Sequence, residues 1–236
     1  MKNTKENHLP IIVTVDGPVG SGKGSLAAML AKYLNFNLLD SGALYRVLAL
    51  AISRHNLDLN EQQKIEKLAT SLNIQFVSHK VGEPASILLD NQDVSDEIRQ
   101  EKCGDIASKI SGYPAVRSAL MQLQKDFVRA PGLVADGRDM GTIVFPDAKV
   151  KFYLTASQEI RAKRRLKQLQ NIPNNINQLS YEQLLLDIQR RDERDMNRPI
   201  APLKPALNAI IIDSSDMTMQ QVFEKMVESI SLLITV

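Results

Sequence analysis

Near its N-terminus the chain reads Gly17-Pro18-Val19-Gly20-Ser21-Gly22-Lys23-Gly24-Ser25. An apolar run at residues 11–16 precedes this stretch and predicts a buried parallel strand. The run at residues 26–31 follows it and predicts a helix. A strand, a glycine-rich loop with a lysine and a hydroxyl, and a helix in this order are typical of a phosphate-binding loop.

The residue types in this loop suit the binding of a polyphosphate. Glycines let the backbone turn and bring its N–H groups close to phosphate oxygens, and the following helix points its positive end at the same anion. Lys23 adds a positive charge for the β- and γ-phosphates. We therefore predict that Gly17 to Ser25 bind the phosphates of a ligand. The alternative is a glycine-rich turn that binds nothing, and the flanking strand and helix argue against it.

The order of residues in the loop narrows the class of protein. The common form of the motif places Ser or Thr directly after the lysine, whereas Gly24 intervenes here and the hydroxyl comes at Ser25. This variant resembles the loop of nucleoside monophosphate kinases.

Composition excludes several other classes of protein. The 236 residues are 44% hydrophobic and 24% charged, which is ordinary for one large globular domain. The formal net charge of +2 gives no general basic surface, so we expect no nucleic-acid partner. Cys103 is the only cysteine, which excludes an internal disulfide and a cysteine-based zinc site.

The chain has no pattern for export or membrane insertion. Residues 1–8 are polar, and no apolar run approaches the roughly 18 residues of a membrane span. We therefore expect a cytoplasmic protein with no membrane partner. Because no long heptad pattern or exposed apolar stripe is visible, we also expect a monomer.

Strand and helix patterns alternate along the chain. After the first strand, β patterns occur at residues 36–40, 73–77, 86–89, 133–136, 150–154 and 209–213. Helical patterns begin at Ser41, capped by Ser41 or Asp40, and recur at 61–71, 101–129 with a break near 112–114, 158–169, 181–195 and 220–232. The alternation predicts an α/β fold with a mostly parallel sheet flanked by helices.

The same alternation of strand and helix patterns predicts the domain organisation. We expect one P-loop kinase domain at residues 10–235. The short β runs around Gly82 and Pro84 predict a β-rich insertion at residues 73–99. Residues 157–180 are predicted to form a short arginine-rich lid region, ending in an asparagine-rich loop.

A second chemical cluster, Asp136-Gly137-Arg138-Asp139, comes directly after a predicted core strand. Ligands of parallel sheets bind at the carboxyl ends of the strands, where Asp16, Asp40 and Asp213 are also expected. Asp136 could orient magnesium-bound water, with the Ser25 hydroxyl as a second metal residue, and Arg138 could bind a phosphate through two hydrogen bonds. The alternative is a capping and ion-pair cluster that only stiffens the loop.

A third cluster, Arg190 to Arg198, alternates in sign at helical spacing, which places Arg191 and Asp195 on one face. Such a pattern is usually a solvated helix. Five basic residues between Arg161 and Lys167, with no acid among them, favour a closing lid that offsets phosphate charge and excludes water. No general base is needed, because a phosphate acceptor is already an anion at neutral pH.

Together these segments resemble the bacterial cytidylate kinase family over nearly the whole chain. The resemblance rests on Gly17 to Ser25, on Leu39 to Arg46, on Asp136 to Ala148 and on Arg191 to Arg198, and its most specific part is Asp136 to Thr142. It implies transfer of the γ-phosphate of ATP to CMP or dCMP with magnesium, and it identifies the β-rich insertion as part of the monophosphate-binding region.

The resemblance also implies a role for each matching residue. Ser41, Arg191 and Asp195 are expected to contact the ribose, and Arg46 and Arg138 the acceptor phosphate. Arg117, Asp139 and Ser108 are expected to read the cytosine edge. Arg198 is expected near the phosphates. The expected catalytic residues are Lys23, Arg138, Arg191 and Arg198, and the expected metal residues are Ser25 and Asp136.

Two positions depart from the family pattern: Ser25 where threonine is usual, and Met196 where an arginine is expected. One alternative is a P-loop kinase with another nucleoside monophosphate as acceptor. Another is a regulatory nucleotide switch, which the absence of an Asn-Lys-x-Asp or Asp-x-x-Gly motif disfavours.

Overall fold

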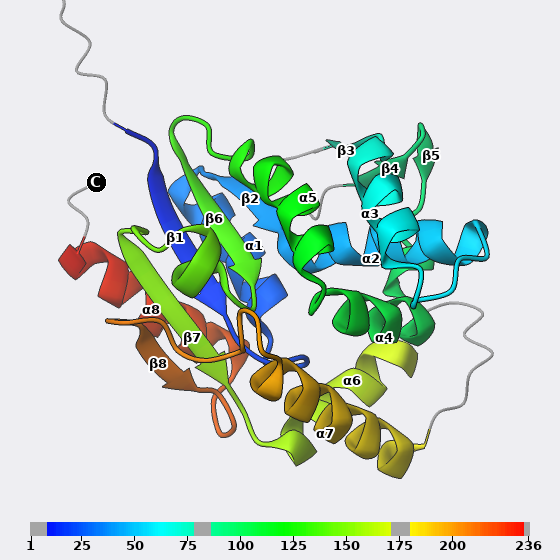
Figure 1. Cartoon of the computed structure of the whole chain (residues 1–236). Helices are drawn as coiled ribbons and strands as arrows, with labels where there is room; N and C mark the ends of the chain where they lie inside the picture. Colours follow the sequence, from blue (N-terminus) through cyan, green and yellow to red (C-terminus); the bar gives the residue numbers. More distant parts are fainter. Residues whose placement is uncertain (1–8, 78–85, 171–179, 234–236) are drawn as a thin grey trace, which may run out of the picture.

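In the computed structural model the described residues are 9–77, 86–170 and 180–233. The centre is a parallel five-stranded sheet in the order β2-β6-β1-β7-β8 (Figure 1). Its strands are β1 (Ile11–Asp16), β2 (Asn37–Asp40), β6 (Gly132–Gly137), β7 (Val150–Thr155) and β8 (Ile210–Asp213). The prediction of an α/β fold with a mostly parallel sheet is confirmed, and every pairing in this sheet is parallel.

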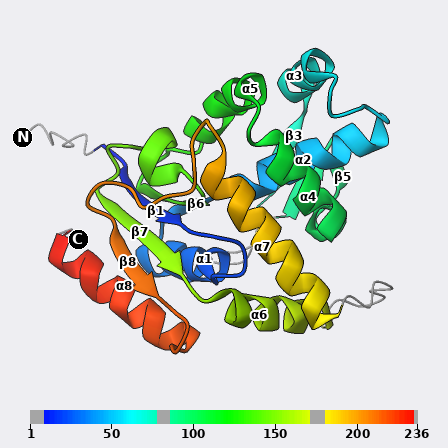
Figure 2. The ribbon, with the colours of Figure 1, turned by 60° about the horizontal axis from the view of Figure 1, so that its bottom comes forward.

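Helices cover both faces of this sheet. The helices are α1 (Lys23–Leu34), α2 (Ser41–Arg54), α3 (Gln62–Ser71), α4 (Glu101–Ile110), α5 (Pro114–Lys125), α6 (Gln158–Gln170), α7 (Tyr181–Asn197) and α8 (Met219–Leu233). α1 and α8 pack on one face through a core that includes Leu30, Phe152 and Met226 (Figure 2). On the other face, Leu44 of α2 and Met140 belong to a core with β2 and β6.

A separate antiparallel sheet lies away from the central one, beside α2 and α3 (Figure 1). Its strands are β3 (Ile74–Val77), β4 (Ser86–Leu89) and β5 (Gln92–Asp93). Ile87 and Leu89 pack against α2 together with buried Ile98 of the short turn η1 (Glu97–Arg99). This sheet lies within the range predicted as a β-rich insertion.

Several local predictions are refined by the structure. The predicted helix at 101–129 ends at Lys125, because the chain turns there before β6. Asp40, not Ser41, is the N-cap of α2, and its side chain accepts the N–H of Ala43 at 3.0 Å. The π-helical turn η2 (Met140–Val144), η1 and β5 were not predicted, since each is too short for a periodic pattern.

Most of the asparagine-rich loop, residues 171–179, lies outside the described residues. None of the described helices has the length and apolar character that crossing a membrane would require.

Candidate active site at the carboxyl ends of the strands

The glycine-rich loop joins β1 to α1 at the edge of the sheet where the parallel strands end. Gly20 has φ +76° and Gly22 φ +90°, backbone conformations that side-chain-bearing residues rarely adopt. Lys23 opens α1, and its Nζ donates to the Pro18 carbonyl at 3.4 Å. The helix N-terminus and the ammonium group are therefore on the same short segment, as anion binding requires.

Lys23 and Asp136 form the electrostatic centre of this loop. Both are buried, and burial, with the nearby charge of Arg138, lowers the pKa of Lys23 to about 8. Burial raises the pKa of Asp136 to about 7, although the charge of Lys23 opposes this shift. Two buried ionisable groups with pKa values displaced toward neutrality are typical of functional sites.

The surroundings of Asp136 fit a hard cation. Its Oδ1 is buried and has no hydrogen-bond partner, and a methyl group on Gly24 would come within 3.1 Å of its Oδ2. The carboxylate therefore faces the start of α1, where the Ser25 hydroxyl also lies. In the part of the chain that the structure describes, no three His, Cys, Asp or Glu side chains form a metal-holding group. Magnesium bound to phosphates needs only one or two protein ligands, so these residues suit it.

A buried ion pair lies between α5 and the loop after β6. Arg117 donates through Nη2 to Asp139 Oδ2, and both side chains are about 95% buried. Arg117 Nη1 also reaches the Tyr45 hydroxyl at 3.4 Å and the Ser111 carbonyl at 3.3 Å. A carboxylate and a guanidinium are thus held side by side, with acceptor and donor atoms of fixed orientation.

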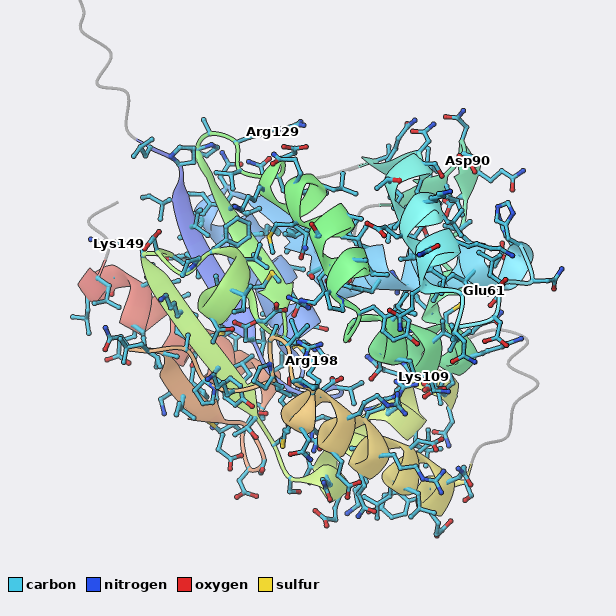
Figure 3. All side chains as sticks on the ribbon, in the orientation of Figure 1. Glu61, Asp90, Lys109, Arg129, Lys149 and Arg198 are labelled. Carbon is cyan, nitrogen blue, oxygen red and sulfur yellow. The ribbon has the colours of Figure 1, made fainter. Side chains whose placement is uncertain are left out.

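Arg198 completes this pair from the end of α7. Its Nη2 lies 3.9 Å from Asp139 Oδ1 and has no hydrogen-bond partner, while its Nη1 donates to Ser111 Oγ at 2.8 Å. Figure 3 shows Arg198 near the ends of β6 and β7. A buried guanidinium nitrogen without a hydrogen-bond partner at this position is a donor available to a ligand.

Asp195 joins α7 to two other predicted residues. Its Oδ1 accepts the Ser108 hydroxyl at 3.0 Å, and its Oδ2 accepts Arg138 Nε at 3.3 Å. Ser108, Arg138 and Asp195 come from three separate segments, and the structure brings them together. Arg191 shares the predicted helix face with Asp195 but pairs with a different group.

That group is Glu101, at the start of α4. Arg191 Nη2 donates to Glu101 Oε2 and Arg165 Nε to Oε1, each at 2.7 Å. Burial acts to raise the pKa of Glu101, but the charges of Arg191 and Arg165 outweigh it and hold that pKa below its usual value. A methyl group on Gly104 would lie 2.9 Å from Arg46 Nη2 and 3.0 Å from Arg191 Nη2, so these two guanidinium groups lie against the same turn of α4.

Arg46 lies beside Arg191, Arg165 and Glu101. Burial, with the charges of Arg191 and Arg165, lowers the pKa of Arg46 to about 10. Three guanidinium groups around one carboxylate produce an excess of positive charge, which suits an anionic ligand. Ser41 is placed differently: its hydroxyl donates to Gln124 Oε1 at 2.8 Å.

The basic residues predicted to form the lid meet partners that other elements supply. Arg161 is buried, pairs with Asp192 of α7, and donates to the Val19 carbonyl of the glycine-rich loop at 3.0 Å. Arg164 donates to the Ser214 carbonyl at 2.7 Å. Residues 161–167 contain no acid, so the acidic partners of Arg161 and Arg165 come from α7 and α4.

Two further carboxylates were missed as parts of the site. Glu101 shows no local signal, because nothing in its own helix indicates which arginines it meets. Asp16 had a signal, its place at a strand end, and it accepts the backbone N–H groups of Met140 and Gly141 at 2.8 Å each.

Comparison with known proteins adds an independent finding. A family model described as cytidylate kinase matches residues 13–232. A cytidylate kinase of Vibrio vulnificus (strain CMCP6) is 51% identical over 93% of this chain and 95% of its own length. One of Pseudomonas fluorescens (strain Pf0-1) is 49% identical over 96% and 97%, respectively.

The solved structures that resemble this chain are more distant. A shikimate kinase from Bacteroides thetaiotaomicron is 10% identical, covers 94% of this chain and 98% of its own, and has a TM-score of 0.45. At this distance the likeness says nothing about substrate.

Proposed function

Because this chain belongs to the cytidylate kinase family and transfers a phosphoryl group from ATP to CMP, we propose which of its residues perform the transfer. Gly17 to Ser25 bind the phosphates of ATP through backbone N–H groups and the Lys23 ammonium. The positive φ of Gly20 and Gly22 and the burial of Lys23 support this role. The acceptor in this proposal is either CMP or dCMP.

The acceptor phosphate is bound by Arg46 and Arg138, and Arg191, Asp195 and Ser41 face the ribose. The cluster of Arg46, Arg191 and Arg165 around Glu101 supports an anion site, because its positive charge exceeds its negative charge. Since the acceptor phosphate is already ionised, transfer needs alignment of the two nucleotides and stabilisation of spreading negative charge. Lys23, Arg138, Arg191 and Arg198 supply that charge.

The single observation that carries the base assignment is the buried pair of Arg117 and Asp139. Asp139 can accept the N4 amino group of cytosine, while Arg117 can donate to its acceptor edge. The Ser108 hydroxyl, which donates to Asp195 Oδ1, would turn from Asp195 to donate to the same edge. Uracil carries an oxygen in place of the amino group, so it would face the carboxylate with two acceptors opposed. Buried polar groups left unpaired in this way reject the wrong base strongly.

Magnesium is held by Asp136 and the Ser25 hydroxyl in this proposal, and when bound it neutralises charge on the transferred phosphate. The unpartnered Oδ1 of Asp136 is the observation that supports it. We also propose that residues 10–235 form one kinase domain, that 73–99 belong to the monophosphate-binding region, and that 157–180 form the lid region.

ADP production measured with CMP, dCMP, UMP, AMP or GMP, each offered separately with ATP and magnesium, tests this function. We expect fast turnover with CMP and dCMP, none in a control without acceptor, and loss of turnover when EDTA removes the metal. Preference for another monophosphate would discard the base assignment but retain the phosphate loop. Slow hydrolysis of ATP at a rate that does not depend on the acceptor would indicate a regulatory switch.

The lowered pKa of Lys23 predicts that ATP affinity depends on pH. Below a pKa of about 8 the free protein already carries the ammonium charge, whereas above it ATP binding must first recruit a proton. We expect the Kd for ATP to rise about tenfold per pH unit above pH 8, and this rise to level off as the pH falls through about 8 toward the pKa of Asp136 at about 7.

Calorimetry in buffers of different ionisation enthalpy checks this directly, because proton uptake should appear above pH 8 and vanish well below it. Lys32→Ala, at an exposed position in the last turn of the same helix, serves as the control and should retain the profile. A Kd that stays constant through about pH 9.5 would contradict an effect of Lys23.

A further inference from the structure

The turn that follows Asp139 lacks the cap that its sequence provides. η2 begins at Met140, and the first N–H groups of any helical turn have no partner within the turn. Asp139 occupies the N-cap position, where an aspartate side chain ordinarily accepts such N–H groups. Its side chain makes no capping hydrogen bond here, because it is directed at Arg117.

Asp16 supplies the missing acceptors from a different strand. Its Oδ1 accepts the Met140 N–H and its Oδ2 the Gly141 N–H, each at 2.8 Å. The carboxylate is 2% exposed, and these bonds span 124 and 125 residues of sequence. One carboxylate from β1 thus satisfies both leading N–H groups of η2.

The position of Asp16 is set by the central strand of the sheet. β1 is the central strand of the sheet, and Asp16 pairs in register with Gly137 of β6 and Tyr153 of β7. A methyl group on Gly141 would come within 2.8 Å of Thr14 Oγ1 and 3.3 Å of Asp16 Oδ2, so the turn lies tightly against β1. Asp16 therefore ties the turn to the same strand that leads into the glycine-rich loop.

Retaining this carboxylate has a cost. Burial raises the pKa of Asp16 to about 6, even though the two N–H bonds act in the opposite direction, and Asp139 adds further repulsion. Removing a carboxylate charge from water opposes folding, and here only hydrogen bonds, with no ion pair described, offset that cost. A specific positioning task would explain its presence.

We propose that Asp16 is a positioning residue for base recognition: by capping η2 in place of Asp139, it leaves the Asp139 carboxylate free to pair with Arg117 and face the cytosine edge. Without Asp16, two N–H groups lose their acceptors, and Asp139 is the adjacent carboxylate that can cap them. Asp139 would then turn away from Arg117, and discrimination between bases would fall. The inference rests on the proposed role of Asp139.

The test is the ratio of kcat/KM for CMP to kcat/KM for UMP. This ratio does not depend on the fraction of active enzyme, so a purely structural role of Asp16 would leave it unchanged. We expect Asp16→Ala to lower the ratio about tenfold or more, since Asp139 then turns toward the N–H groups of η2 and its hydrogen bond to the base, one that involves a charged group, is lost. Asp16→Asn keeps one acceptor oxygen and should lower the ratio less.

Two further variants keep the proposal testable if Asp16→Ala fails to fold. Gly141→Ala retains Asp16 but pushes the turn away from it, and it should also lower the ratio. Asp213→Asn is the matched control, because Asp213 also ends a strand but is exposed and accepts only from Ser215 among the hydrogen bonds described. It should leave the ratio unchanged.

The outcomes separate the two assignments. If Asp139→Asn lowers the ratio while folded Asp16→Asn and Gly141→Ala leave it unchanged, the positioning role of Asp16 is overturned and base reading by Asp139 stands. If Asp139→Asn also leaves it unchanged, base reading by Asp139 fails, and the role of Asp16 fails with it. The proposal is supported if the CMP-to-UMP ratio of kcat/KM falls in Asp139→Asn, Asp16→Asn and Gly141→Ala and is unchanged in the control, Asp213→Asn.

Discussion

Lys23→Ala is expected to lower kcat/KM about 1000-fold with ATP and CMP as substrates, the scale seen when one preorganised charge or donor is removed. Lys23 is the only lysine in the glycine-rich loop, and it is positioned at the first turn of α1. Its ammonium group contacts the protein only through a long hydrogen bond to the Pro18 carbonyl, among the contacts described. Under the proposed role, the ammonium group is therefore available to a bound phosphate.

The fold should survive this substitution. Lys23 makes no described ion pair within 4.0 Å, and burial already disfavours its charge. Steady-state kinetics, with the thermal unfolding midpoint measured alongside, separate catalysis from stability. Lys32→Ala should retain full activity. A folded Lys23→Ala protein with unchanged kcat/KM would contradict the assignment of the loop as the ATP site.

Asp139→Ala is expected to have a double effect, on stability and on specificity. It leaves the Arg117 guanidinium buried without its partner and removes the nearest carboxylate described for Arg198. Breaking a buried ion pair from one side typically costs about 3–5 kcal/mol of unfolding free energy. The same change removes the acceptor proposed for the N4 amino group, so the preference for CMP over UMP should fall.

Asp139→Asn isolates the effect on specificity. The amide keeps the shape of the carboxylate but offers a donor that matches the O4 oxygen of uracil and opposes the amino group of cytosine. We expect the CMP-to-UMP ratio of kcat/KM to fall about 10- to 100-fold, the equivalent of one hydrogen bond to a charged group. Asp147→Asn, at an exposed position after the same turn, is the control and should leave the ratio as it is.

Much of the fold could be predicted because its signals are local. The apolar run at residues 11–16 and the glycines that follow it indicate a buried strand, a tight turn and a helix within 24 residues, and these are β1, the loop and α1. The alternation of strands and helices then leaves few arrangements other than a parallel sheet. Short elements such as β5 and η2 were missed because two to five residues carry no period.

The site could be predicted in part for a related reason. Strands of a parallel sheet end at one edge, so the sequence alone predicts that Asp136, Arg138 and Asp139 lie beside the glycine-rich loop. Helical spacing indicated Asp195, and the family resemblance gave base-reading roles to Arg117 and Ser108; the structure pairs Arg117 with Asp139 and Ser108 with Asp195. The partners of the lid arginines were not foreseen.

By itself, then, the sequence determined the glycine-rich loop between a strand and a helix, the order of the main strands and helices, and the family, since each depends on residues that are neighbours in the chain. Tertiary structure alone decided which partner each charged side chain meets. Glu101 pairs with Arg191, 90 residues away, and Asp16 accepts the N–H of Met140, 124 residues away. The chain offers 29 basic and 27 acidic residues, and local periodicity does not select among their pairings. Packing of α4, α7 and the central strand selects them, because a buried charge is stable only where the fold places its partner.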